Sequence, residues 1–178
     1  MNGTMNRVDH VVWVVRAENI KQYVEEFTAL YGVDFDFRDG PRNDRSPVQT
    51  YVAWDAGLEL IAPFESPDAR PIAEHPVASK LAAHLDEHGE GIFGVVFRVP
   101  DLEEAVARAS ALGYAPSSVA PHLADKAARM KTHGAWTKKV LDIHETFIST
   151  FLNTHVIFGE FEYPDEVADA STHEQGSP

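Results

Sequence analysis

The stretch "DHVVWVV" (residues 9–15) can be superimposed on "FGVVFRV" (residues 93–99) without a gap, and this repeat decides the fold. Both stretches are apolar and rich in β-branched residues, which is typical of strands, and each leads into a helical pattern. Asp9 then falls on Phe93, and His10 on Gly94. The sequence therefore predicts two copies of one unit, one of which lacks the histidine.

The first copy is predicted to contain a strand, a helix and three further strands. In "AENIKQYVEEFTALYG" (residues 17–32) apolar residues recur at helical spacing up to a glycine that can end a helix. "VDFDF" (residues 33–37) alternates as a half-buried strand does. "VQTYVAW" and "LELIA" follow as strands joined by a hairpin at Asp55, Ala56 and Gly57.

The second copy repeats this order after a connector that contains one helix. Asp101 and Glu104 form a capping-box pattern at the start of its helix. "HETFISTFL" and "HVIFGEFEY" are predicted to be its closing strands, with a turn at Asn153 and Thr154. "EFEYP" matches "ELIAP", so that Glu160 falls on Glu59, and the extra residues of this copy fall within 114–143. The predicted organisation is a first βαβββ module at 7–63, a helical connector at 64–90, a second module at 91–164 and a disordered acidic tail at 165–178.

Composition excludes several classes of function. The chain has 178 residues, 44% of them hydrophobic, which suits one compact soluble protein. A net charge of -13 argues against a sequence-independent nucleic-acid binder, which needs a basic face. Without cysteine there is no disulfide, thiolate metal site or cysteine nucleophile. The N-terminus shows neither a signal-peptide pattern nor an apolar run that could span a bilayer, so we expect a cytoplasmic protein with no membrane partner.

The tandem units, with "DHV" opening the first and a glutamate on the last strand of each, resemble the vicinal oxygen chelate superfamily of glyoxalases, bleomycin-resistance proteins and dioxygenases. "LELIAP" and "GEGIFGVVFRVPDLEEA" look most like its methylmalonyl-CoA epimerase branch. The resemblance covers roughly residues 7–164. It implies an α+β fold in which two βαβββ modules form a cup-shaped, mostly antiparallel sheet with the helices outside.

The resemblance also implies a divalent metal at the bottom of the cup, held by the first and last strands of each module. The corresponding positions here are His10, Glu59, Gly94 and Glu160. Alternation along the strands agrees with this mapping, because it places His10 and Glu59 on one face, and Asp9 on the other. Nitrogen and oxygen donors suit Zn, Mn, Fe, Co or Ni.

Gly94 cannot act as a ligand through a side chain, so another donor is needed for a full set. His144 is the first substitute, and His155, His133 and His122 are alternatives. Each of these histidines could equally lie on the surface. Four residues are expected to bind substrate in the cup. Arg98, Phe158 and Glu162 occupy inward strand positions, and Gly94 leaves room for the substrate.

These residues favour a metal-dependent epimerase, isomerase or lyase that removes a proton next to a metal-bound carbonyl of a small acid or thioester. Glu59 or Glu160 would be the general base. A non-haem iron dioxygenase is the first alternative, although it needs a second histidine. A metal-free cup that binds a small molecule, or that performs acid/base chemistry without a cofactor, is the second. We expect a small-molecule substrate and, from the resemblance, a homodimer.

Overall fold

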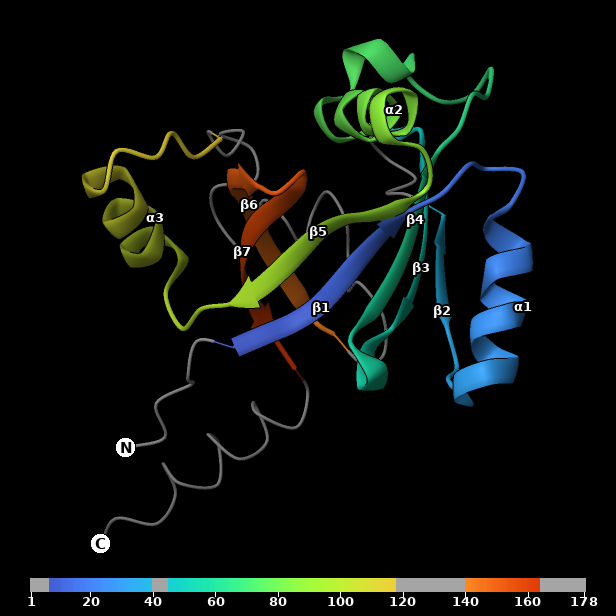
Figure 1. Cartoon of the computed structure of the whole chain (residues 1–178), viewed down its shortest axis with the longest axis horizontal. Helices are drawn as coiled ribbons and strands as arrows, with labels where there is room; N and C mark the ends of the chain where they lie inside the picture. The colour runs from blue at the N-terminus through green and yellow to red at the C-terminus, as the bar shows by residue number, and fades with distance from the viewer. Residues whose placement is uncertain (1–6, 40–44, 118–139, 164–178) are drawn as a thin grey trace, which may run out of the picture.

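In a computed structural model, which describes residues 7–39, 45–117 and 140–163, the chain folds around one seven-stranded sheet. The strand order is β2-β3-β4-β1-β5-β7-β6. Figure 1 shows β1 and β5 side by side at the centre of this sheet. The strands and helices are β1 (Arg7–Val14), α1 (Ile20–Tyr31), β2 (Asp36–Asp39), β3 (Val48–Ala53), β4 (Leu58–Pro63), α2 (Pro76–His88), β5 (Gly91–Arg98), α3 (Leu102–Ala111), β6 (Asp142–Phe151) and β7 (Thr154–Glu162), with short 3-10 turns at Trp54–Ala56 and Ile72–Glu74.

The predicted α+β fold with a mostly antiparallel sheet is confirmed. Neighbouring strands are antiparallel except for two pairs, β1 with β4 and β5 with β7. Helix α1 packs beside β4, α3 packs against β6 and β7, and α2 lies across β1, β4 and β5 (Figure 1). None of the helices within the described residues is long and apolar enough to cross a bilayer.

Local sequence signals explain where the helices begin and end. Helix α1 ends at Gly32, whose φ of 66° is the left-handed conformation that glycine adopts most readily. Helix α2 begins with Pro76, and the imidazole of His75 accepts a hydrogen bond from a first-turn amide. The Asp101 side chain accepts from the Glu104 amide, which forms the predicted cap of α3.

Two tight turns place the last strands of the two halves. Gly57 follows the 3-10 turn with a φ of 63°, and a Cβ there would lie 2.8 Å from the carbonyl oxygen of Asp9. This close approach allows the Val11 amide to donate to the Gly57 carbonyl. Leu152 and Asn153 both have positive φ and form the β6–β7 turn, one residue earlier than the sequence indicated.

The ladder between β1 and β5 has an internal two-fold symmetry. Arg7 pairs with Arg98, and Val14 pairs with Gly91. Each β1 residue has a counterpart on β5 that is 84 positions later, as Gly94 is the counterpart of His10. When both residues of a pair are replaced by their counterparts, the first of these pairs becomes the second. The pair of His10 with Val96 exchanges in the same way with the pair of Val12 with Gly94. This offset is the one at which "DHVVWVV" superimposes on "FGVVFRV".

The register of this ladder shifts twice along β1, once between Val8 and His10 and once between Val12 and Trp13. The first shift leaves Asp9 as an extra residue, and the second leaves its counterpart Phe93 as an extra residue. A β-bulge interrupts strict alternation, so neighbouring residues can share a face. Asp9 and His10 therefore both reach the same side of the sheet, which corrects the expectation that Asp9 faces away.

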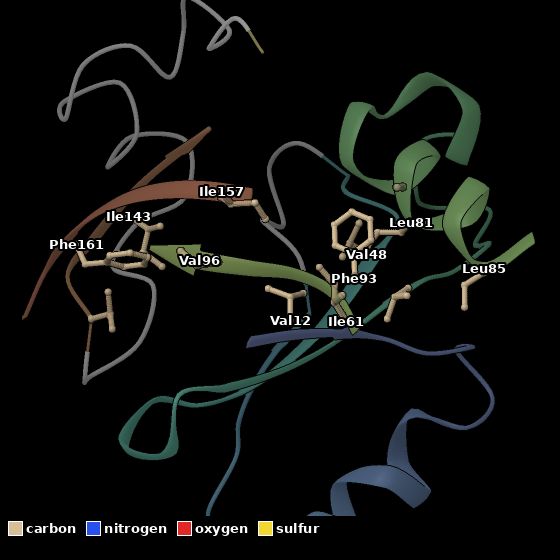
Figure 2. Packing of buried hydrophobic residues seen from close by; sticks show 13 residues of the cluster. Val12, Val48, Ile61, Leu81, Leu85, Phe93, Val96, Ile143, Ile157 and Phe161 are labelled. Atoms are coloured by element: carbon tan, nitrogen blue, oxygen red, sulfur yellow. The ribbon is translucent and has the colours of Figure 1, made fainter. Parts of the chain in front are cut away.

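The two faces of the sheet carry different cores. On the face that we call the inner face, the main cluster joins β1, β4, β5, β6 and β7 to helix α2 (Figure 2). The outer face carries two smaller clusters, one under α1 and one under α3. Buried residues of the inner cluster are Val12, Val14, Val48, Ile61, Ala78, Leu81, Leu85, Phe93, Val96, Val140, Ile143, Ile157 and Phe161.

Candidate active site

His10 is the centre of a polar cluster on the inner face. It is 3% exposed, and each of its ring nitrogens meets a carboxylate. Nδ1 lies 2.9 Å from Oδ1 of Asp9, and Nε2 lies 3.2 Å from Oε2 of Glu59. The bulge brings Asp9 to this face, and the parallel pairing of β1 with β4 brings Glu59 alongside. The predicted meeting of His10 with Glu59 on one face is thus observed.

These carboxylates control the charge of the imidazole. Burial disfavours the imidazolium form, but the hydrogen bonds to Asp9 and Glu59, together with the negative charges of Glu59 and Glu145, outweigh it and raise the pKa of His10 to about 10. His10 is therefore a cation at neutral pH, with an N–H group directed at each carboxylate.

Glu145 on β6 is the third carboxylate of the cluster. Glu145 is an exposed residue, yet enough protein lies around its carboxylate that desolvation raises its pKa. The positive charge of His10 opposes this shift, the negative charges of Glu59 and Asp9 add to it, and the pKa reaches about 7. Such a carboxyl group can both accept and donate a proton near neutral pH.

Tyr163 and Arg98 extend the network beyond His10. The Tyr163 hydroxyl donates to both Asp9 oxygens, at 3.1 Å and 3.3 Å, and burial and the Asp9 charge raise the pKa of its phenol. The guanidinium of Arg98 lies 4.8 Å above the Tyr163 ring and donates to the Phe161 carbonyl at 3.4 Å. Arg98, predicted to bind substrate, is thus 4% exposed and linked to the cluster through Tyr163.

Aromatic rings border the imidazole. Trp54 and Phe161 each meet the His10 ring edge to face, with ring centroids 5.9 Å and 5.8 Å away. The indole N–H of Trp54 is buried and has no hydrogen-bond partner within the described part of the chain. A buried donor without a partner costs free energy, which an incoming oxygen atom would recover.

Several residues predicted to face the same cavity lie instead on the outer face. The Glu160 carboxylate accepts a hydrogen bond from the Leu102 amide at the start of α3, and Phe158 packs in the α3 cluster. His144 pairs directly with Glu160, and Glu162 lies two residues further along β7, so both share that face. The expected convergence of Glu160, Glu162, Phe158 and His144 with His10 is therefore corrected. The inward positions of β7 belong to Ile157, Gly159 and Phe161.

The other predicted positions are distributed over the inner face and beyond the described residues. Gly94 pairs with Val12 on one side and with His155 on the other. His155 lies among aromatic rings, 4.5 Å from Phe93 between centroids, and its Nδ1 lies 3.0 Å from the Thr150 hydroxyl. His122, His133 and the tail 165–178 lie outside the described residues.

The predicted metal-ligand set is not assembled by these side chains. His10 and Glu59 meet, but His144 and Glu160 lie across the sheet from them. Asp9 and Glu59 approach opposite edges of the imidazole and so do not converge on one point. Within residues 7–39, 45–117 and 140–163 no three His, Asp or Glu side chains are grouped to hold a metal ion. These residues do not fit the expected three- or four-ligand site.

Sequence reasoning missed Asp9, Glu145 and Tyr163. The bulge that turns Asp9 inward leaves no clear signal in the sequence, because its flanking residues are ordinary strand formers. Glu145 did have a signal, since Ile143 and Phe147 at alternate positions around it are apolar. Matching "EFEYP" to "ELIAP" obscured this signal, because it assigned the inward face to Glu160.

The comparison with protein families agrees with this fold. Residues 9–132 match the model of the Glyoxalase/Bleomycin resistance protein/Dioxygenase superfamily. The chain belongs to this superfamily. The resemblance inferred from the repeated units and the "DHV" opening of the first is thereby confirmed.

Curated relatives in this superfamily are 4-hydroxyphenylpyruvate dioxygenases. The protein of Caenorhabditis elegans is 33% identical over 112 residues, which are 62% of this chain and 26% of that protein. The protein of Pyricularia oryzae is 26% identical over 161 residues, which are 86% of this chain and 37% of that protein. The chain thus spans well under half the length of these relatives.

Solved structures with a similar fold include methylmalonyl-CoA epimerases. One from Streptomyces coelicolor, in complex with 2-nitronate-propionyl-CoA, has a TM-score of 0.56 at 14% identity and covers 88% of this chain and 98% of its own. One from Mycobacterium tuberculosis has a TM-score of 0.55 at 16% identity and covers 90% and 91%. At such identity the likeness shows a shared fold.

Proposed function

We propose that this chain is an enzyme that moves a proton on a carbon next to a carbonyl group of a small acid or thioester. The observation that supports this is the position of the Glu145 carboxylate on the same face as the Asp9–His10–Glu59 unit. The methylmalonyl-CoA epimerases that share its fold make thioesters the first substrates to try.

In the proposed reaction Glu145 is the general base. It takes the proton from the substrate carbon, and the electron pair of the broken C–H bond moves onto the carbonyl oxygen. Return of this proton from Glu145 to a neighbouring atom isomerises the substrate, whereas inversion of the centre needs a second proton donor, which solvent water would supply on the opposite face. Desolvation, together with the charges of Glu59 and Asp9, raises the pKa of Glu145 against the opposing charge of His10, which makes this transfer feasible near neutral pH.

Two donors on the inner face can stabilise the negative charge that develops on oxygen. The Trp54 indole N–H is buried beside His10 without a partner in the described residues. The Nε2–H of His10 faces Glu59, and the positive charge of the imidazolium would attract the developing negative charge of a bound oxygen. Every step of this proposal uses side chains of the chain itself.

The test is solvent deuterium incorporation into 2-substituted acids and their CoA thioesters, followed by mass spectrometry under anaerobic conditions. We expect Glu145→Gln to slow exchange by at least about 100-fold, the usual contribution of a general base. Glu160→Gln should exchange at nearly the wild-type rate, because its carboxylate lies on the outer face. Trp54→Phe should reduce kcat more than it changes KM.

The same experiment separates the alternatives. Exchange lost in Glu160→Gln but kept in Glu145→Gln would reject this assignment in favour of the one read from sequence. Binding of a substrate analogue without exchange would indicate a sequestering protein. Oxygen consumption with a 2-oxo acid, after loading with Fe²⁺, would indicate the dioxygenase chemistry named for the curated relatives.

A further inference from the structure

The symmetry of the β1–β5 ladder identifies which residues of the second half correspond to the polar pair of the first. Val12 corresponds to Val96 in that ladder. Val12 lies opposite Glu59 on β4, and Val96 lies opposite Ile157 on β7. The counterpart of Glu59 is therefore Ile157, three residues before Glu160. The counterpart of His10 is Gly94.

The Ile157 side chain occupies the space that a side chain at position 94 would need. A Cβ at Gly94 would lie 3.1 Å from Cδ1 of Ile157 and 3.2 Å from the carbonyl oxygen of His155, both closer than ordinary contact. Ile157 is 5% exposed and belongs to the inner-face core. The histidine and glutamate of the first half thus have an apolar, closely packed pair as their symmetry mates.

The other inner-face positions show the same division between the halves. Asp9, which orients His10, has Phe93 as its counterpart, and Phe93 is 2% exposed in the core. One half of the inner face therefore carries carboxylates around His10, while the other half carries Gly94, Phe93 and Ile157 at the matching positions, beside the imidazoles of His155 and His84. Glu145 is the exception, because it is a carboxylate that the second half contributes to the polar side.

We infer that the inner face carries one half of a two-fold metal site, His10 with Glu59, and that the packed contact of Gly94 with Ile157 has replaced the other half. Two protein ligands hold a transition metal poorly, since catalytic zinc sites supply three. This inference goes beyond the proposed function, because it concerns metal affinity and its test measures no turnover. It also predicts where ligands must be added to restore a site.

The test is to restore the missing half with Gly94→His combined with Ile157→Glu, and to titrate Co²⁺ and Zn²⁺ into the full-length chain. Glutamate is unbranched at Cβ but keeps a carbon at the δ position, so the two new side chains share this space as neighbouring ligands. Changes in the outer shell of metal sites alone alter affinity about 10–100-fold, so two new ligands should strengthen Co²⁺ binding by more than about 100-fold. A Co²⁺ absorption band and metal content by mass spectrometry are the readouts.

Matched variants make each outcome decisive. His10→Ala in the restored background should abolish the gain, whereas His144→Ala and Glu160→Gln should leave it unchanged, because both residues lie on the outer face. If the double variant fails to fold by circular dichroism, Ile157→Glu alone supplies a third ligand and should bind Co²⁺ about tenfold more tightly. The inference is overturned if the wild type holds stoichiometric metal that Glu59→Gln removes, or if the folded restored variants bind no more tightly than the wild type.

Discussion

Gly159 determines where the Glu145 side chain can lie. It pairs with Glu145 across the β6–β7 ladder, and a Cβ built on it would collide with the Phe161 ring and lie 3.3 Å from Cγ of Glu145. Phe161 in turn borders His10. A single missing methyl group therefore allows the carboxylate and the aromatic wall to approach the imidazole together.

Gly159→Ala should destabilise the protein and displace both neighbours. Overpacking of a core position costs about 1–3 kcal/mol, which we expect as a loss of unfolding free energy in urea. Gly91→Ala is the matched control, because a Cβ on that strand glycine meets nothing within 4 Å. Equal effects of the two substitutions would show that the close contacts at Gly159 carry no energetic weight.

At this scale the sequence predicts part of the candidate site. His10 and Glu59 could be placed on one face from strand alternation, because nothing interrupts alternation on β4 and His10 lies just beyond the bulge. The match of "EFEYP" to "ELIAP" puts Glu160 at the position of Glu59, whereas the ladders put Ile157 there. This error of three residues, an odd number, moves the side chain of Glu160 to the opposite face. Asp9 depends on the bulge itself, which the residue pattern does not encode.

Among the elements, the connection from β1 to α1 depends on Glu90, the residue that precedes β5. Its carboxylate accepts hydrogen bonds from the Arg16 amide at 2.7 Å, the Asn19 side chain at 2.9 Å and the Tyr23 hydroxyl at 2.9 Å. Burial raises the pKa of Glu90, but these hydrogen bonds outweigh it and hold the pKa below its usual value of 4.5. The Glu90 side chain thus connects the start of α1 to the central pair of strands by hydrogen bonds.

Because the pKa of Glu90 is lowered in the folded state, its contribution to stability is present above pH 4.5 and is lost as the pH falls through the lowered pKa. Glu90→Gln should therefore lower the unfolding free energy by about 1 kcal/mol at pH 7, and by progressively less in acid. Glu25→Gln, on the exposed side of α1, is the control. A pH-independent difference between wild type and Glu90→Gln would contradict the hydrogen-bonding role of its charge.

The elements themselves were largely predictable. The three helices follow from apolar spacing and from caps such as Asp101, and most strands follow from alternation between turn residues. The order of the strands required more than these local signals. It could be inferred only because the first strand is repeated and the repeat resembles a known superfamily.

Across the whole molecule, one core joins the two halves and the connector helix. Val12 and Ile61 from the first half, Leu81 from α2, and Val96 and Ile157 from the second half all belong to the inner-face cluster (Figure 2). Neither half can lose its packing without exposing the other. We therefore expect a single unfolding transition.

Leu81→Ala tests this expectation, because Leu81 is fully buried between α2 and the sheet. Its loss should cost about 2–5 kcal/mol and shift one common transition, seen alike by circular dichroism and tryptophan fluorescence. Leu112→Ala, at a residue that is 78% exposed, should change stability by less than about 0.5 kcal/mol. Two separate transitions in either variant would mean that the halves unfold independently.

The β1–β5 ladder has a consequence for assembly. Because every pair in it has a symmetry mate, the two halves meet across an approximate two-fold axis, as identical subunits do in an isologous interface. Two chains could therefore exchange halves and keep each backbone hydrogen bond in the same register, with the connector at 64–90 deciding whether the halves close on themselves or on a neighbour. A shortened connector would favour the exchanged dimer, in which Asp9, His10 and Glu59 of one chain would face Glu145 of the other.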